Sequence, residues 1–412
     1  MMSILHISTT DNYGGSGRAA YRIHTSLRDR GISSHMFVGK KVTTDTDVAL
    51  IRGPLLRGVD GVCGRILDRV GYQYLFYPSS FFLPFRKWFR DADVVQLYNT
   101  HGGYFSHTSL PLLSALKPIV WRLSDLWPIT GHCTYTIECG MPYEDHRGSC
   151  VHISDYPQLT RDSTDFLWRT KRWLYAHSRL TIVAPSRWIA EIVKKSPLLG
   201  RFPLVIIPNG LDIETFKPIP KGEARRFFSL DPHALVILFS AHSLLDKRKG
   251  GVYLEEALKK IVAQESFQNV TVLLMGKDAS SCPVPPILRK HVIDLISDDT
   301  VLAKAYAAAD VFVLPTLADN LPNGALESMA CGTPVITFRV GGVPEAVRHM
   351  ETGYLAAVHS SDDLARGINL LLGDRQLRER LGNNARRVAL AEYTLTLQAQ
   401  RYLQLYEHIL SS

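Results

Sequence analysis

Short apolar runs alternate with helical segments along almost the whole sequence, and this pattern restarts once near residue 203. In the first half, residues 3–8, 34–38 and 94–97 have the length and composition of buried strands, and helical segments separate them. Strands that alternate with helices predict a parallel sheet that is covered on both faces. The expected fold class is therefore α/β, with two open sheets in succession.

The length agrees with this division, because 412 residues exceed one typical core and suit two domains of roughly 200 residues each. The turn signal Pro208-Asn209-Gly210 marks the junction. We expect an N-terminal Rossmann-like domain over residues 1–205 and a C-terminal Rossmann-like domain over residues 206–392. The last segment, residues 393–412, is predicted to be a helix that packs back toward the N-terminal domain.

Composition excludes several classes of protein. Hydrophobic residues make up 46% of the chain and charged residues 21%, so no large disordered region is expected. No apolar run approaches the roughly 18 residues that span a bilayer, and residues 1–10 lack the features of a signal peptide. We expect a cytoplasmic protein with reduced cysteines. The net charge of +8 favours anionic partners, although charge alone does not distinguish among them.

Two glycine-rich segments follow predicted strands and precede predicted helices. The first, Gly14-Gly15-Ser16-Gly17, precedes a helix expected over residues 18–30 and lacks the G-x-G-x-x-G spacing of a nicotinamide site. The second is Asp246-Lys247-Arg248-Lys249-Gly250-Gly251. Cations and backbone amides at the start of a helix suit a diphosphate. Each segment can equally be a turn without a ligand, and the second one a solvated basic turn.

Two acids and a second glycine pair lie farther along the chain. Asp319 falls in a loop after an apolar strand, and Glu327 falls about one turn into the next helix. Carboxylates suit vicinal diols because both oxygens accept hydrogen bonds, so these acids fit a ribose and a sugar ring. Asp319 or Asn320 can also simply cap the helix. Gly341-Gly342 follow the next strand and precede another helix.

Several stretches of the sequence resemble one enzyme family. The string DNLPNGALESMACGTPVITFRVGGVPEAV resembles the donor-site signature of glycosyltransferase family 4. IPNGLDIETFKP is similar to that family's interdomain junction, and DKRKGGVYLEEAL to its phosphate-binding loop. NYGGSGRAAYRIHTSLRDRGISS and WRLSDLWPITGHCTYTIECG resemble a bacterial subgroup of colanic-acid type that builds cell-surface polysaccharides. The resemblance covers nearly the whole chain and implies the GT-B fold, with two Rossmann-like domains facing each other across a cleft.

The resemblance also implies roles for individual residues. Glu327 matches the acid that binds the donor ribose, and Asp319 stands where the family has a second glutamate. Ser243 replaces a family arginine, for which Arg248 or Lys247 can substitute, and Ser124-Asp125 replaces a His-Asp pair. The expected catalytic residues are Asp319, Lys249 and Asp125. The expected donor-binding residues, none of them a metal ligand, are Glu327, Arg248, Lys249, Gly14, Gly15, Asn320, Leu321, Gly341 and Gly342.

The implied reaction is a retaining, metal-independent and cofactor-independent transfer of a sugar. Its donor would be a UDP- or GDP-sugar, and its acceptor a glycan or a lipid-linked oligosaccharide in polysaccharide biosynthesis. Lys249 and Arg248 would stabilise the leaving diphosphate, while Asp319 would orient the sugar. The departures at residues 124, 243 and 319 leave a second hypothesis open, a non-catalytic subunit that binds a sugar nucleotide. A disaccharide phosphorylase with the same fold is a third.

Cysteine and histidine are dense between residues 132 and 152. Cysteine and histidine in such density can bind zinc. The residues are Cys133, Cys139, Cys150, His132, His146 and His152. Their spacings are irregular and lack C-x-x-C, so an acceptor-side loop without a metal is the other interpretation.

Residues 52–90 are rich in aromatic residues and carry seven basic and two acidic residues. Such a stretch can lie at a membrane interface, here the inner face of the plasma membrane. Alternatively, its aromatic side chains fill a core or line an acceptor cleft. Nucleic acid is not an expected partner, because the sequence has no recognisable nucleic-acid-binding module.

Overall fold

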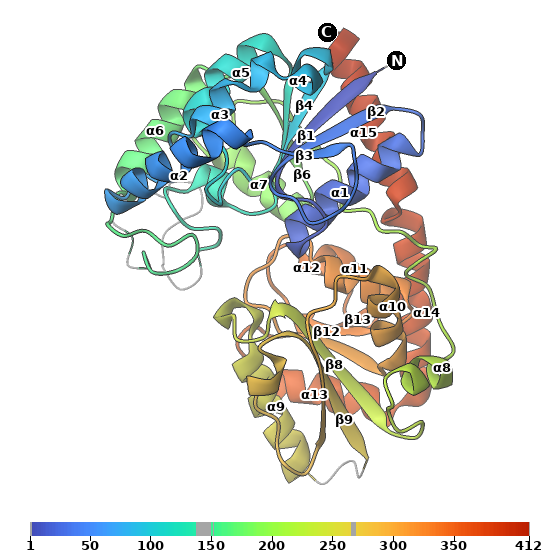
Figure 1. The fold of residues 1–412 in the computed structure, drawn as a ribbon. Coiled ribbons are helices and arrows are strands. Elements are labelled where there is room, and N and C mark those ends of the chain that lie inside the picture. Colours follow the sequence, from blue (N-terminus) through green and yellow to red (C-terminus); the bar gives the residue numbers. More distant parts are fainter. Residues whose placement is uncertain (1, 137–149, 151, 265–268, 412) are drawn as a thin grey trace. The chain divides into compact units, whose positions relative to one another are not determined.

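A computed structural model of the chain describes residues 2–136, 150, 152–264 and 269–411 (Figure 1). The chain folds as two compact units. Unit 1 comprises Met1–Pro208 together with Gln398–Ser412, and unit 2 comprises Asn209–Leu397. The units divide after residue 208, whereas the sequence predicts a boundary after residue 205. Unit 1 therefore includes the end of the chain as well as its beginning.

Unit 1 is built on a parallel sheet with the strand order β3-β2-β1-β4-β5-β6-β7. Its strands are β1 Ser3–Thr10, β2 Ser33–Lys40, β3 Val48–Leu50, β4 Val94–Leu97, β5 Ile119–Arg122, β6 Leu180–Ala184 and β7 Leu204–Ile206. Its main helices are α1 Gly14–Arg28, α2 Pro54–Arg69, α3 Pro78–Phe81, α4 Lys87–Asp91, α5 Leu110–Leu116, α6 Thr164–Ala176 and α7 Arg187–Lys195. Helices thus connect parallel strands, as the sequence predicts.

Helices cover both faces of this sheet, because successive side chains of a strand point to opposite sides. On one side, Leu5 and Ile7 of β1 share a core with residues of α5, α6 and α7. On the other side, Ile4 shares a core with residues of α1 and of α15, Leu395–Ser411. Tyr406 of α15 also donates a hydrogen bond to Gln96 in β4. The last helix of the chain therefore completes unit 1 (Figure 1).

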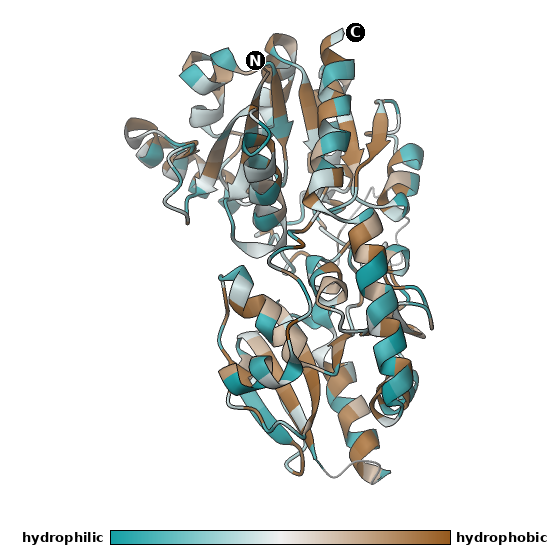
Figure 2. Ribbon diagram, turned by 90° about the vertical axis from the view of Figure 1, so that its right-hand side faces the viewer, coloured by the Kyte–Doolittle hydropathy of each residue, from teal (hydrophilic) through white to brown (hydrophobic). Residues whose placement is uncertain are grey.

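Unit 2 is built on a second parallel sheet, with the strand order β10-β9-β8-β11-β12-β13. Its strands are β8 Leu235–Ser243, β9 Val270–Lys277, β10 Arg289–Ile293, β11 Val311–Leu314, β12 Val335–Phe338 and β13 Gly353–Ala356. Its helices are α8 Lys221–Phe227, α9 Gly251–Ala263, α10 Asp299–Ala308, α11 Asn323–Ala330, α12 Val343–Ala346, α13 Ser361–Gly373 and α14 Arg375–Glu392. Strands are mostly hydrophobic, whereas helices carry hydrophilic stretches (Figure 2).

Structure and sequence-based expectation differ at the sheet edges and at the first helix. The strand β10 was not predicted, because its residues are exposed or half-buried and carry no apolar run.

α1 begins at Gly14, so residues 14–17 form its first turn rather than a separate turn before residue 18. A Cβ on Gly17 would lie 2.1 Å from Thr10 Oγ1. This glycine therefore allows α1 to approach β1 closely.

Candidate functional site

Three loops at one edge of the unit 2 sheet contain most of the expected site residues. The 3-10 helix Lys247–Lys249 follows β8, residues 315–322 follow β11, and residues 339–342 follow β12. β11 pairs in parallel with both β8 and β12, so the carboxyl ends of these strands lie at the same edge. Ligands of open α/β sheets bind at this edge.

Two glycines determine how these loops pack. Gly250 has a φ of +69°, and a Cβ there would lie 1.8 Å from the carbonyl oxygen of Pro315. Gly341 has a φ of +53°, and a Cβ there would lie 2.0 Å from the carbonyl oxygen of Asp319. The Gly342 N–H donates to that same oxygen at 3.2 Å. Only glycine fits at either close contact, so these packed loops fix the backbone of Asp319.

The carboxylate of Asp319 contacts two cations of the first loop. Its Oδ2 lies 2.7 Å from Lys249 Nζ and 3.4 Å from Arg248 Nη1. Arg248 also donates to the Ala318 carbonyl oxygen at 3.0 Å, and its backbone N–H donates to Asp246 Oδ1 at 2.9 Å. The side chains of Lys249 and Asp319 are 16% and 14% exposed. The pair is therefore largely shielded from solvent and still accessible to a ligand.

The charges of this cluster shift the pKa values of its members. Burial would raise the pKa of Asp319, but Lys249 and Arg248 outweigh that effect and hold the pKa below its ordinary value. Burial, reinforced by Arg248, lowers the pKa of Lys249 against the opposing effect of Asp319. Asp319 is therefore ionised at neutral pH. With three basic residues against two acids, the cluster of residues 246–249 and 319 favours an anionic ligand.

Glu327 lies in α11, the helix that follows the second loop. It is 4% exposed, and Tyr306 of α10 donates a hydrogen bond to its Oε2 at 3.2 Å. Tyr306 was not predicted, because nothing in its own segment marks it as a partner of this acid. Asn320 and Leu321 are buried as well, and Asn209 Nδ2 donates to the Leu321 carbonyl oxygen at 2.9 Å. These residues all belong to unit 2.

Ser243 occupies the position at which the resemblance implies an arginine. Its Oγ donates to Asp278 Oδ2 at 2.9 Å, so the side chain is engaged with the segment that follows β9. Of the two suggested substitutes for the missing arginine, Arg248 contacts Asp319, whereas Lys247 is exposed. Arg248 is therefore the better placed of the two.

The expected residues of unit 1 lie near the carboxyl ends of β1 and β5. Gly14 and Gly15 begin α1, and the next residue, Ser16, places its Oγ 3.0 Å from Ser124 Oγ. Arg122 Nη1 donates to Ser124 Oγ at 2.9 Å. Ser124, which stands where the resemblance implies a histidine, therefore links the glycine segment to β5.

Asp125 lies beside a histidine that was not predicted from the sequence. Its Oδ2 is 2.9 Å from His101 Nε2, and its Oδ1 accepts from the Trp127 N–H at 3.0 Å. The side chains of His101 and Asp125 are only 4% and 9% exposed. His101 Nδ1 lies 3.2 Å from the Tyr156 hydroxyl oxygen. The signal that could have found His101 is its position just after β4, which pairs with β5.

Two family models match the chain. Residues 13–215 match the model described as Glycosyltransferase Family 4, and residues 222–388 match the model described as Glycosyl transferases group 1. Each unit is therefore similar to a glycosyltransferase-family domain. The three loops of unit 2 lie within the group 1 match, and the His101–Asp125 pair lies within the family 4 match.

Curated relatives match parts of the chain. A D-inositol 3-phosphate glycosyltransferase of Pseudarthrobacter chlorophenolicus is 32% identical over 190 residues, which cover 44% of this chain and 44% of that protein. The N,N'-diacetylbacillosaminyl-diphospho-undecaprenol alpha-1,3-N-acetylgalactosaminyltransferase of Campylobacter jejuni is 28% identical over 229 residues, covering 54% of this chain and 59% of that enzyme. The chain spans about half the length of the curated relatives that it matches.

Solved structures resemble the chain over its whole length. Sucrose-phosphate synthase from Thermosynechococcus elongatus has a TM-score of 0.71 at 19% identity and covers 100% of both chains. Anabaena HepE in complex with UDP-glucose has a TM-score of 0.66 at 17% identity, covering 99% of this chain and 100% of HepE. At these identities the likeness concerns the fold. The chain has the GT-B fold, as the resemblance in its sequence implies.

Proposed function

We propose that this protein is a glycosyltransferase that takes its sugar from a nucleoside-diphosphate donor bound to unit 2. The observation that carries this proposal is the cluster of Lys249, Arg248 and Asp319 at the carboxyl edge of the unit 2 sheet. Its excess of positive charge matches a diphosphate. Glu327, in the helix after the same loop as Asp319, provides a buried acid for the donor ribose.

The departing diphosphate is the group that needs stabilisation during the transfer. Negative charge develops on its oxygens as the bond to the sugar breaks, and preorganised cations stabilise that charge. Lys249 and Arg248 supply these cations, and the start of α9 adds backbone N–H groups beside them. This arrangement gives the reaction a means of leaving-group stabilisation that does not need a metal ion. The family resemblance adds retention of configuration at the transferred sugar.

Asp319 changes partners in this scheme. It contacts Lys249 at 2.7 Å, and a diphosphate carries more negative charge than one carboxylate. The donor therefore competes for Lys249 and Arg248, which leaves the carboxylate of Asp319 to accept hydrogen bonds from the sugar hydroxyls. We assign Asp319 to orientation of the sugar and not to a covalent step.

Known proteins guide the choice of substrates. The HepE structure contains UDP-glucose, and the name of the Campylobacter enzyme specifies a sugar on diphospho-undecaprenol. We therefore favour a UDP-sugar over a GDP-sugar as donor, and a lipid-linked glycan as acceptor. His101 and Asp125 of unit 1 are the polar groups that we assign to the acceptor side, together with the N-terminal turn of α1. The colanic-acid-type resemblance adds a role in cell-surface polysaccharide biosynthesis.

An exposed apolar face on α2 supports contact with a membrane surface. Four residues at helical spacing form this face, and their exposed fractions are 93%, 47%, 48% and 60% for Leu55, Val59, Val62 and Ile66. The same helix carries Arg57, Arg65 and Arg69. Among the described residues, no helix is both long and apolar enough to cross a membrane. We propose that α2 binds peripherally to anionic lipids at the inner face of the plasma membrane.

A ligand screen tests the proposed function. The thermal unfolding midpoint is measured with UDP, GDP and a panel of their sugars, followed by release of free nucleoside diphosphate with and without lipid-linked acceptor. We expect one nucleoside diphosphate and one of the corresponding nucleotide sugars to raise the midpoint by several degrees. The same nucleotide sugar should then be hydrolysed slowly, which releases free nucleoside diphosphate. Binding without any turnover would identify a non-catalytic subunit, and phosphate-dependent release of a sugar phosphate would identify a phosphorylase. No response to any nucleotide would remove the basis of the proposal.

A further inference from the structure

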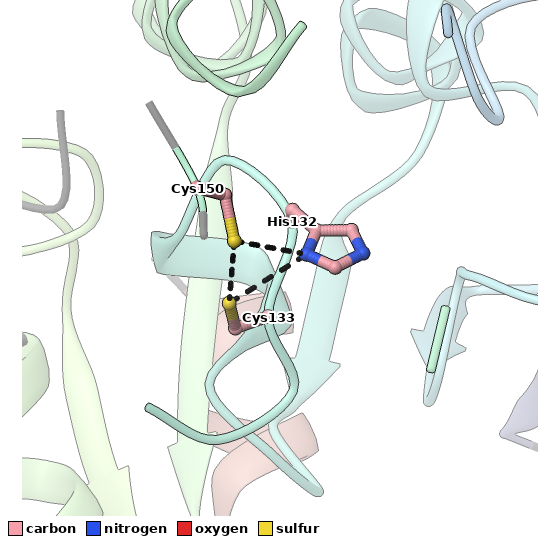
Figure 3. A group of neighbouring side chains, drawn as sticks. All are labelled: His132, Cys133 and Cys150. Carbon is pink, nitrogen blue, oxygen red and sulfur yellow. Dashed lines mark hydrogen bonds between the residues drawn. The ribbon is translucent and has the colours of Figure 1, made fainter. Parts of the chain in front are cut away.

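Three side chains of metal-ligand type meet in unit 1, apart from the residues assigned above (Figure 3). They are His132, Cys133 and Cys150, of which His132 and Cys133 are buried and Cys150 is half-buried. The two sulfur atoms lie 3.8 Å apart. His132 Nδ1 lies 3.6 Å from the sulfur of Cys133 and 3.7 Å from that of Cys150. The three atoms therefore form a nearly equilateral triangle.

The sides of this triangle match the edges of a tetrahedron around a metal ion. Bonds of about 2.3 Å from zinc to sulfur and about 2.0–2.1 Å from zinc to nitrogen place tetrahedral ligands about 3.8 Å apart for two sulfur atoms and about 3.5–3.6 Å apart for sulfur and nitrogen, an overall range of about 3.5–3.8 Å. The observed separations of 3.6, 3.7 and 3.8 Å fall within that range. The sulfur–sulfur separation is also far longer than the roughly 2.05 Å of a disulfide bond. The three atoms are therefore spaced like ligands of one metal ion, and the two cysteines are not joined by a disulfide bond.

The far side of the His132 ring determines which nitrogen faces the sulfur atoms. His132 Nε2 lies 2.5 Å from the Pro157 carbonyl oxygen. A carbonyl oxygen only accepts hydrogen bonds, so Nε2 carries the proton and Nδ1 of the neutral ring presents its lone pair to both sulfur atoms. Metal-bound histidines in proteins are oriented by such a second hydrogen bond.

The backbone around the cluster is held by further hydrogen bonds. Thr130 Oγ1 donates to the Cys133 carbonyl oxygen at 2.6 Å, and Lys171 Nζ of α6 donates to the Thr130 carbonyl oxygen at 2.9 Å. The Cys150 N–H donates to Asp162 Oδ2 at 3.1 Å. These bonds preorganise the three ligand atoms. Two thiolates, one neutral imidazole and one divalent cation carry no net charge together, which suits a buried position.

We propose that His132, Cys133 and Cys150 bind one Zn²⁺ ion that stabilises unit 1. Thiolate and imidazole ligands in tetrahedral geometry select zinc over calcium or magnesium. The ion would join residues 132–133, which follow β5, to residue 150, which precedes α6. The role of this ion would be structural. The proposed ligands belong to unit 1, whereas Lys249 and Arg248, which we assign to the diphosphate, belong to unit 2. The ion therefore leaves the metal-independent transfer unchanged.

The described residues provide three of the four positions of a tetrahedron. His152, which the sequence grouped with this cluster, instead places its Nδ1 3.9 Å from Asp155 Oδ2. Cys139 and His146, grouped with it as well, lie outside the described residues and are not part of the proposal. Water or another ligand would complete the coordination.

Metal analysis of the purified full-length chain tests the site. After growth with zinc and dialysis, elemental analysis should find about one zinc per chain. Cys133→Ser and Cys150→Ser should each retain less than about a tenth of that amount, because a hydroxyl is a far weaker zinc ligand than a thiolate. Cys63→Ser, which changes a half-buried cysteine on α2, should retain all of it. Zinc-free wild-type protein, or full zinc content in both serine variants, would overturn the proposal.

A second measurement does not depend on how well the variants fold. Wild-type protein is stripped with a chelator and titrated with Co²⁺ alone. One equivalent should produce the intense thiolate-to-cobalt absorption of a tetrahedral site, and Zn²⁺ should then abolish it. A disulfide between Cys133 and Cys150, seen by mass spectrometry in protein purified without reductant under zinc-replete conditions, would contradict the metal site. So would a flat cobalt titration of reduced protein.

Discussion

Lys249 and Lys247 lie in the same short 3-10 helix but differ in their surroundings. Lys249 is largely shielded and contacts Asp319, whereas Lys247 is exposed. We expect Lys249→Ala to weaken binding of the donor by about 10- to 100-fold, because a hydrogen bond to a charged group contributes roughly 1.5–3 kcal/mol. Lys247→Ala removes the same charge and should change the affinity by less than about threefold. Calorimetric titration measures the donor affinity of both variants. Equal losses of affinity would indicate that the basic turn attracts the donor only through its net positive charge.

His24 makes the stability of unit 1 depend on pH. Its Nδ1 lies 2.8 Å from Ser34 Oγ in a buried cluster, and burial lowers its pKa to about 4 against the opposing effect of Asp45. The unfolded chain has the ordinary histidine pKa near 6.5, so the unfolded state binds more protons between these two values. Unfolding free energy should therefore fall as the pH drops from about 7 to 4, by about 2 kcal/mol at pH 5.

Denaturant titrations at pH 7 and pH 5 check this dependence on His24. His24→Gln should reduce the difference between the two pH values, because the group that takes up the proton is gone. His233→Gln, which changes an exposed histidine, should keep the wild-type difference. A His24→Gln variant with the full pH dependence would show that other groups cause it.

Contacts between distant residues are the part of the site that the sequence could not predict. Lys249, Asp319 and Glu327 were each expected, because each belongs to a local pattern of glycine, charge and helix start. His101 and Tyr306 were not, since their partners Asp125 and Glu327 lie 24 and 21 residues away in the chain. The first pair depends on which strand ends meet at a sheet edge, and the second on which helices pack together. The pattern of a single sequence predicts that edge but not the side chains that touch across it.

At the scale of elements, Gly250 joins the 3-10 helix Lys247–Lys249 to α9. A Cβ there would lie 1.8 Å from the Pro315 carbonyl oxygen, and the φ of +69° is itself unfavourable for other residues. Gly250→Ala should therefore destabilise unit 2 by about 2 kcal/mol or more in chemical denaturation. Gly373→Ala at the end of α13 meets no atom within 4 Å and should leave stability within about 1 kcal/mol of wild type. Equal free energies of unfolding for the two variants would show that the loop around residue 315 shifts to accommodate the new Cβ without destabilising unit 2.

The helix α2 is the element that we assign to a membrane surface. Leu55 and Ile66 are its most exposed apolar residues, so Leu55→Glu combined with Ile66→Glu should reduce binding to anionic vesicles at least about tenfold. Leu370→Glu on α13 makes the same type of change at another exposed leucine and should have little effect. Sedimentation with vesicles of phosphatidylglycerol and phosphatidylcholine measures the difference. Undiminished binding of the double variant would contradict the assignment.

Elements with a strong apolar signal were predicted well, and those without one were not. β4 has the bounds expected from the apolar run at residues 94–97, because a strand buried on both faces needs such a run. β3 and β10 lie at the edges of their sheets, where one side remains open and polar residues are tolerated. The start of α1 was misplaced, because glycines in the first turn of a helix have the composition of a loop.

At the scale of the whole molecule, the two parallel sheets account for the two family matches. The chain crosses from unit 1 to unit 2 near residue 208 and returns near residue 398. Nearly all residues that we assign to the donor belong to unit 2, whereas the His101–Asp125 pair and the proposed zinc site belong to unit 1. Donor binding and acceptor binding are therefore assigned to different units of the chain.

The most direct test of the central claim is calorimetric titration of the matching UDP-sugar into wild-type protein and Glu327→Ala. Glu407→Ala, an exposed change on α15, serves as the control, and thermal melts establish that all three proteins are folded. We predict saturable binding to the wild type and the control, and a loss of at least about 100-fold for Glu327→Ala, since a buried acid contributes charge-assisted hydrogen bonds to the ribose. A folded Glu327→Ala protein with wild-type affinity would contradict donor binding at this site.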